Sequence, residues 1–130
     1  QIRSSAASDV YKRQFKDHLT ISADIVRWSL NAMIIAEEKG ITSTNVDEMK
    51  NSKDPETLRL LGVSKVGDTG KGYGAWLGLD DDWAYNIIKQ VGNYSESFEK
   101  HIGVNTPINI ARGLNALYKD GGILYAPPFR

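Results

Sequence analysis

Apolar side chains recur at helical spacing along most of this chain, and that pattern limits the folds it can adopt. From Ser22, a residue type that caps helices, apolar residues return every three or four positions until Gly40, which stands where a helix-ending glycine is expected. These apolar positions cover more than one helix face, so we expect the helix to pack against two neighbours. No internal repeat and no parallel-sheet pattern follows. The sequence therefore predicts a mainly α structure with almost no strand.

Capping residues and glycines divide the middle of the chain. Asp54, Pro55 and Glu56 have the order of an N-cap, a first-turn proline and a first-turn acid, which predicts a helix that ends at Gly62. The next stretch, 62–78, contains six glycines and is predicted to be a long flexible loop.

Two longer helices are expected in the second half. Apolar residues keep one helical phase from Asp81 to Ile102, so we expect an unbroken helix across Gly92 in spite of the cost of about 1 kcal/mol for an internal glycine. The Thr-Pro pair at 106–107 predicts a last helix that reaches Tyr118. The tail 123–128 should be extended, because proline disfavours the α conformation of the residue before it.

Residues 1–14 are small and polar without a sustained period, and they predict a tail that is disordered or an artefact, leaving 15–130 as the folded segment. The sequence has no initiator methionine, and residues 1–14 lack the apolar core of a secretory signal. We therefore expect a fragment of a longer protein.

Composition disfavours several classes of function. Sixteen basic residues balance sixteen acidic ones, so no net charge attracts nucleic acid or anionic lipid. The absence of cysteine excludes a disulfide framework, a thiolate metal site and a cysteine nucleophile. No apolar run approaches the ~20 residues that span a bilayer.

The candidate motifs for catalysis and metal binding are weak. The loop 67–74 lacks the Ser or Thr that follows the lysine of a phosphate-binding loop, since Gly72 follows Lys71. Asp80, Asp81 and Asp82 could bind a hard cation, but acids at a helix N-terminus more often cap it. His18 and His101 lack a metal-ligand spacing. We expect no catalytic residue, no metal, no cofactor and no enzymatic activity.

Aromatic side chains give one further candidate surface. They could stack on a ligand, but at helical spacing they more often pack in the core or between helices. The residues concerned are Trp28, Trp76, Trp83, Tyr85, Tyr94 and Tyr118.

Several longer stretches resemble a known family. The most specific is the block 78–94, GLDDDWAYNIIKQVGNY, and others include DIVRWSLNAM at 24–33 and RGLNAL at 112–117. From Asp24 onward the sequence is similar to the periplasmic general L-amino-acid-binding proteins, which are family 3 solute-binding proteins of polar amino acid ABC importers. Residues 15–23 do not match the family closely, and the loop 67–76 looks longer than usual.

The resemblance implies the C-terminal helical segment of a type II periplasmic-binding-protein fold, in which two α/β lobes close on one amino acid. It implies a parent that captures polar L-amino acids in the periplasm as a monomer and delivers them to an ABC permease, without binding nucleic acid or entering the membrane. The ligand-binding residues are unknown and are expected mainly upstream of this segment. The alternatives are a free-standing helical interaction module and, with less support, a lyase on the same fold.

Overall fold

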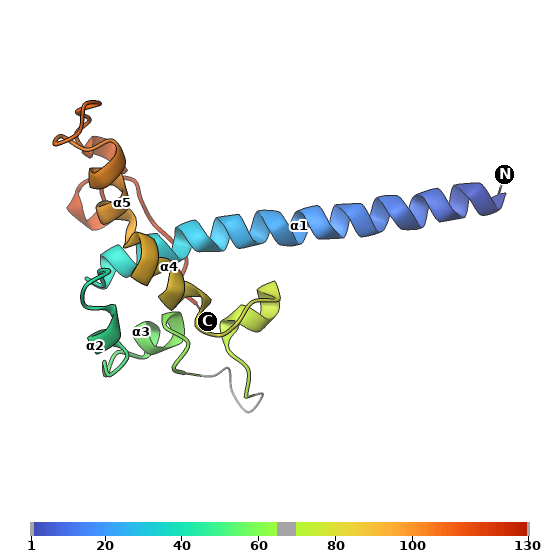
Figure 1. Ribbon diagram of the computed structural model, residues 1–130, viewed down its shortest axis with the longest axis horizontal. Coiled ribbons are helices and arrows are strands. Elements are labelled where there is room, and N and C mark those ends of the chain that lie inside the picture. The colour runs from blue at the N-terminus through green and yellow to red at the C-terminus, as the bar shows by residue number, and fades with distance from the viewer. Residues whose placement is uncertain (1, 65–69, 130) are drawn as a thin grey trace.

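The computed structural model describes residues 2–64 and 70–129, and the side chains of 19–64 and 70–129. One long helix, α1 (Ile2–Glu38), projects far beyond the other elements, which gather around its C-terminal half (Figure 1). There Ala32, Ile34, Ile35 and Ala36 are buried. As predicted, the helix stops before Gly40, whose φ of 68° is the left-handed conformation that glycine adopts without strain.

The start of α1 differs from the prediction. The helix begins at Ile2 rather than Ser22, and it includes residues 2–14, for which the sequence predicts an irregular tail. No glycine or proline precedes Gly40, so no residue in this stretch interrupts the intrahelical hydrogen bonds. The side chains of these residues lie outside the described part of the chain.

Two short helices follow, α2 (Val46–Met49) and α3 (Pro55–Leu60). The predicted cap of α3 is confirmed, because the carboxylate of Asp54 accepts hydrogen bonds from the backbone N–H and the hydroxyl of Thr57, at 3.2 and 2.8 Å. The helix thus presents Leu60 to the core, where it is almost fully buried.

The glycine-rich stretch is not a uniform loop. Residues 65–69 lie outside the described residues, but Tyr73–Leu77 forms a 3-10 helix, η2. The backbone N–H of Gly72 donates to Oδ1 of Asp81 at 2.8 Å, which ties the stretch to the start of the next helix. Gly74 is buried, and a Cβ built there would lie 2.3 Å from the Asp80 carbonyl oxygen.

The predicted continuous helix across Gly92 is wrong. The chain forms α4 (Trp83–Val91) and a separate α5 (Tyr94–His101), since Gly92 adopts φ 83° and ψ −174°. Asn93 and Glu96 form a capping box at the start of α5, and Glu96 also accepts hydrogen bonds from Ser43. These polar contacts give the start of α5 a stable conformation outside a continuous helix.

The predicted last helix is also wrong. The region holds two 3-10 turns, η3 (Gly113–Asn115) and η4 (Tyr118–Asp120), in otherwise irregular backbone. Two residues have left-handed dihedrals that an α-helix does not admit, Asn109 at φ 54° and Gly113 at φ 49°. In this region Leu117 is buried, whereas Ile108 and Leu114 are exposed.

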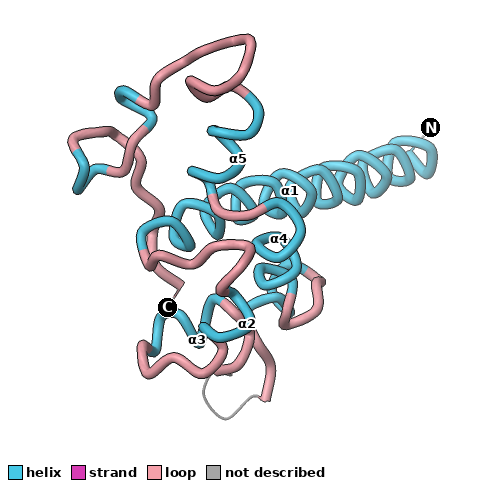
Figure 2. The backbone as a smooth tube through the Cα atoms, turned by 60° about the vertical axis from the view of Figure 1, so that its left-hand side comes forward, coloured by secondary structure: helices cyan, strands magenta, loops and turns pink. Residues whose placement is uncertain are grey.

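The core is formed where the C-terminal half of α1 meets α3, α4 and the last residues of the chain. Figure 2 shows helices joined by loops, and the described residues contain no strand, only an isolated bridge between Leu117 and Leu124. The mainly α expectation is confirmed. The buried apolar residues that form this core cluster are Ala32, Ile34, Ile35, Ala36, Ile41, Val46, Leu60, Leu61, Trp83, Ala84, Ile88, Leu117, Ala126 and Phe129.

One part of α1, Leu19–Glu38, is long and apolar enough to meet the length and composition criteria for a membrane span. The same criteria are met by core helices of soluble proteins. Its last two turns pack into the core through Ala32, Ile35 and Ala36. Only 22% of its apolar window is buried, so this packing covers the end of the segment alone, and the expectation that no apolar run reaches membrane-spanning length does not hold by these criteria.

Candidate functional site: the C-terminal strap

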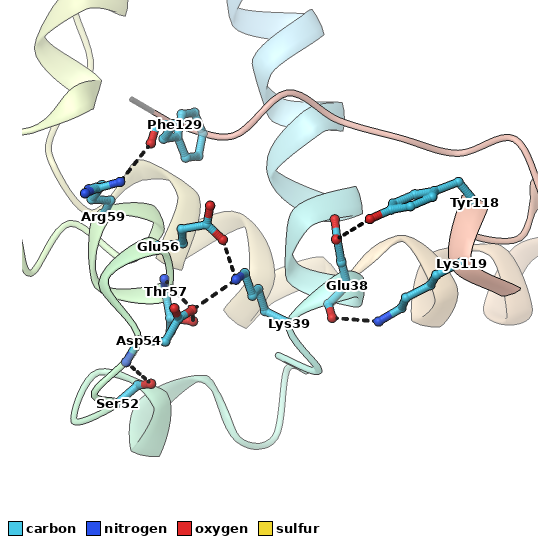
Figure 3. Close-up of polar contacts among 10 residues, drawn as sticks. All are labelled: Glu38, Lys39, Ser52, Asp54, Glu56, Thr57, Arg59, Tyr118, Lys119 and Phe129. Atoms are coloured by element: carbon cyan, nitrogen blue, oxygen red, sulfur yellow. Dashed lines mark hydrogen bonds and ion pairs between the residues drawn. The ribbon is translucent and has the colours of Figure 1, made fainter.

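The last residues of the chain, 117–129, run back across the end of α1, and we call them the C-terminal strap. The strap carries Phe129 into an aromatic cluster. The ring of Phe129 stacks on Trp28 at 5.2 Å between centroids, and the ring of Trp83 meets it edge-on at 5.9 Å. The carbonyl oxygen of Phe129 accepts a hydrogen bond of 3.4 Å from Arg59 (Figure 3).

Beside this cluster lies an apolar hollow of about 240 Å³. Aromatic rings, Leu77 and Pro128 form its walls, and Trp76, 81% exposed, stands at its rim. Such a hollow can take an apolar or aromatic group but offers few charged contacts. The residues that line it are Trp28, Tyr73, Trp76, Leu77, Trp83, Pro128 and Phe129.

A second hollow, of about 200 Å³, lies under the middle of the strap and is more polar. In this hollow the ammonium group of Lys39 contacts the carboxylates of Glu56 and Asp54, the latter at 3.3 Å (Figure 3). Glu38 accepts two hydrogen bonds from the strap. The Tyr118 hydroxyl donates to its carboxylate at 3.3 Å, and the Lys119 ammonium donates to its backbone carbonyl oxygen at 3.0 Å. These contacts fasten the strap to the end of α1.

Charges and hydrogen bonds around the second hollow shift the pKa values of three side chains. The hydrogen bond to Glu56 raises the pKa of Lys39. Partial burial lowers this pKa, and the hydrogen bond to Asp54 raises it further. Hydrogen bonds from Thr57 lower the pKa of Asp54, and Lys39 lowers it further. The charge of Glu38 raises the pKa of the Tyr118 hydroxyl. Lys39 is therefore cationic and Asp54 anionic across the neutral range, while the Tyr118 hydroxyl stays protonated.

Replacing Asp54 by alanine should lower the free energy of unfolding by about 1 kcal/mol, because the α3 cap is lost. The lowered pKa of Asp54 stabilises the fold above its ordinary value of about 3.9, and this contribution is lost as the pH falls through the folded-state pKa. The free energies of unfolding of wild type and Asp54→Ala, measured by urea denaturation, should thus differ by a constant amount between about pH 5 and pH 9. They should converge as the pH falls below about 4.

The matched control is Asp82→Ala. Asp82 occupies the N-cap position of α4 but makes no side-chain capping bond, so its loss should change stability by less than about 0.5 kcal/mol. An equal loss in the two variants would contradict a specific capping role for Asp54.

A partly buried ion pair joins the irregular region before the strap to α1. Arg112 donates to both carboxylate oxygens of Glu37 at 2.9 and 3.1 Å, and it also donates to the carbonyl oxygen of Asn115. Its guanidinium lies 5.3 Å from the ring centre of Tyr94 and 5.4 Å from that of Phe98. One side chain therefore connects α1, α5 and η3.

The candidate acids and histidines are not brought together. Asp81 binds the Gly72 N–H, Asp82 makes no capping bond, and His101 is exposed on α5. The expectation that these acids cap α4 is thus wrong in detail, because Asp81 turns to the glycine-rich stretch instead. Within residues 2–64 and 70–129, apart from side chains before residue 19, no three metal-ligating residues cluster. The His18 side chain and residues 67–69 of the loop 67–74 lie outside the described residues.

The predicted aromatic residues do not form one surface. Trp28 and Trp83 pack around Phe129, which the sequence interpretation did not single out. Tyr85 instead donates to Asp47 at the surface, where the carboxylate also contacts Lys89. Phe129 and Arg112 were missed, although the pair of prolines at 127–128 signals a segment that packs as an extended chain rather than a helix.

The sequence is similar to curated amino-acid-binding proteins, although no protein-family model matches it. It is 57% identical over 107 residues to the general L-amino acid-binding periplasmic protein of Rhizobium johnstonii. It is 52% identical over 108 residues to the glutamate/glutamine/aspartate/asparagine-binding protein of Rhodobacter capsulatus. Each match covers 82% of this chain but only 30% of the relative.

A solved structure gives the same assignment. A periplasmic binding protein of an ABC transporter from Brucella ovis, with glutathione bound, matches with a TM-score of 0.77 and 52% identity. The match covers 85% of this chain and 33% of that one. At 52–57% identity to such proteins, this chain is a homologue of the periplasmic binding proteins of amino-acid ABC transporters and matches about a third of their length.

Proposed function

We propose that this chain serves as the strap-bearing helical segment of a periplasmic protein that captures polar L-amino acids and delivers them to an ABC permease. The observation that carries the proposal is the identity of more than half of the aligned residues with two amino-acid-binding proteins. In this proposal the parent acts as a monomer, without enzymatic activity, and the ligand contacts lie mainly in the part of the protein that this chain does not match.

The structure supports a scaffolding role for the segment itself. Several of its charged groups are paired with one another, as Lys39 is with Glu56 and Arg112 with Glu37. An amino acid requires groups that bind both its α-amino and α-carboxylate ends in a closed cleft. The apolar walls of the larger hollow do not supply that pair of charges.

Glutathione is a second candidate ligand for the parent protein. The observation that favours it is the Brucella ovis structure, which has glutathione bound at 52% identity to this chain. The γ-glutamyl group of glutathione carries free α-amino and α-carboxylate groups, as an amino acid does. One cleft could thus accept either ligand.

Isothermal titration tests the proposal. The chain alone should give no heat with L-glutamate, L-glutamine, L-aspartate, L-asparagine or glutathione. A hybrid should bind one of these ligands with a Kd of about 1 μM or tighter. The hybrid is the Rhizobium johnstonii relative in which this chain's residues replace the matched segment.

The unmodified relative is the control for ligand quality. Saturable binding by the chain alone would contradict the placement of the ligand contacts elsewhere. A folded hybrid that binds none of the five ligands would contradict the proposed function.

A further inference from the structure

The larger hollow, beside Phe129, is formed entirely by this chain. Four segments supply its walls, namely α1, η2, the start of α4 and the strap. Its volume is about 240 Å³, and none of the described residues that line it carries a charge. Because all of its walls come from one chain, the hollow needs no further polypeptide to be complete.

The tryptophans of the chain gather at this hollow. The sequence contains three of them, and all three line it. Trp83 is 8% exposed and meets the ring of Phe129 edge-on, and Phe129 in turn stacks on Trp28. Trp76 differs, because it is 81% exposed, the highest value among the exposed large apolar residues. Two tryptophans thus belong to the packed inner walls, while the third leaves an indole ring open to solvent at the rim.

We propose that the larger hollow binds a neutral aromatic small molecule of one ring or two fused rings. An apolar cavity of about 150 Å³ takes up benzene, so a hollow of about 240 Å³ has room for somewhat more than one ring. Aromatic rings stack on other rings or meet their edges, and five of the seven lining residues are aromatic. An ion is disfavoured, because no charge in the lining compensates for the water that it loses.

This ligand differs in chemistry from the amino acid of the proposed function. A polar amino acid needs partners for both of its charged ends, and the lining of the larger hollow has none. The site proposed here is therefore a second one, separate from the amino-acid cleft of the parent protein. The inference goes beyond the proposed function and does not depend on it.

Titration with indole tests the proposal. In the ¹⁵N-labelled chain the three indole N–H signals report directly on the hollow, because every tryptophan lines it. These signals should shift saturably with a Kd of about 1 mM or tighter, as expected for a ligand of so few atoms. Phenol should bind about fivefold more tightly than cyclohexanol, which has a similar size but no aromatic face. Equal binding of phenol and cyclohexanol would contradict the aromatic class of the ligand.

Two variants locate the bound indole. Trp76→Ala should weaken its binding by about fivefold and leave the fold intact, because the ring of Trp76 is exposed. The matched control is Tyr125→Ala, which removes a ring that is 60% exposed and lies outside this lining, so the affinity should not change. The absence of a saturable shift, or equal affinities of wild type and Trp76→Ala, would overturn the proposal.

The hybrid with the Rhizobium johnstonii relative distinguishes this site from the amino-acid cleft. Indole should bind the hybrid as it binds the chain, and saturating L-glutamate should not displace it. Displacement by L-glutamate, or binding of indole to the chain but not to the hybrid, would overturn a separate site in the parent protein. If the hybrid binds indole but none of the five polar ligands, the aromatic site stands and the proposed function fails.

Discussion

Replacing Arg112 by methionine should lower the free energy of unfolding by about 3 kcal/mol. The side chains of Arg112 and Glu37 are only 16% and 14% exposed, so the substitution leaves the Glu37 carboxylate largely buried without its cation. Removing one member of a buried ion pair typically costs about 3–5 kcal/mol, and partial exposure places this pair at the lower end. Urea denaturation of the full chain, followed by circular dichroism, measures the change.

Two further variants isolate the cause. Arg27→Met removes an arginine from a pair with Asp24 that is exposed, at 69% and 38%, and should change stability by less than about 0.5 kcal/mol. Glu37→Met combined with Arg112→Met should restore most of the loss, because no unpaired charge remains. If Arg112→Met is no more destabilising than Arg27→Met, the pair does not anchor the irregular region before the strap.

Local capping signals in the sequence predict the end of α1 and the start of α3. The Asp54-Pro55-Glu56 start and the glycine after α1 act within one turn of helix, so their effects depend little on distant contacts. Both are confirmed by the dihedrals and hydrogen bonds of the structure. The mainly α class follows from the same helical period.

The break between α4 and α5 shows why apolar period alone misleads. Ile88 and Phe98 are both buried, which preserves the phase that predicts one helix. The decisive contacts are polar, since Glu96 accepts from the backbone N–H groups of Asn93 and Ser43, at 2.8 and 3.1 Å. Asn93 and Glu96 have capping-box spacing in the sequence. Giving this capping signal more weight than the apolar helical period predicts a break between α4 and α5.

The C-terminal region depends on contacts with distant residues. Arg112 reaches Glu37, and Lys119 reaches the Glu38 carbonyl, both on a helix about seventy to eighty positions earlier in the chain. No propensity within 106–118 encodes these partners, so the helical pattern there predicted the wrong structure. The aromatic cluster around Phe129 has the same origin, because its partners Trp28 and Trp83 come from α1 and α4.

Replacing Phe129 by alanine should cost about 3 kcal/mol and release the strap from the core. Phenylalanine-to-alanine changes in cores cost about 3–5 kcal/mol, and Phe129, at 9% exposed, is not fully buried, which favours the lower value. Its ring contacts Trp28, Tyr73 and Trp83, so tryptophan emission should also shift to longer wavelength as water enters the cluster.

Two further variants distinguish the loss of core packing from a general effect of truncating a side chain of the strap. Phe129→Leu keeps most of the apolar volume and should cost about 1.5 kcal/mol or less with little change in emission. Tyr125→Ala removes an aromatic ring of the strap that is 60% exposed and should leave the emission unchanged. Thermal unfolding and fluorescence of the three variants measure both effects. If Phe129→Ala matches Tyr125→Ala in both, the strap is held by its polar contacts at Glu38, and the aromatic cluster is not its anchor.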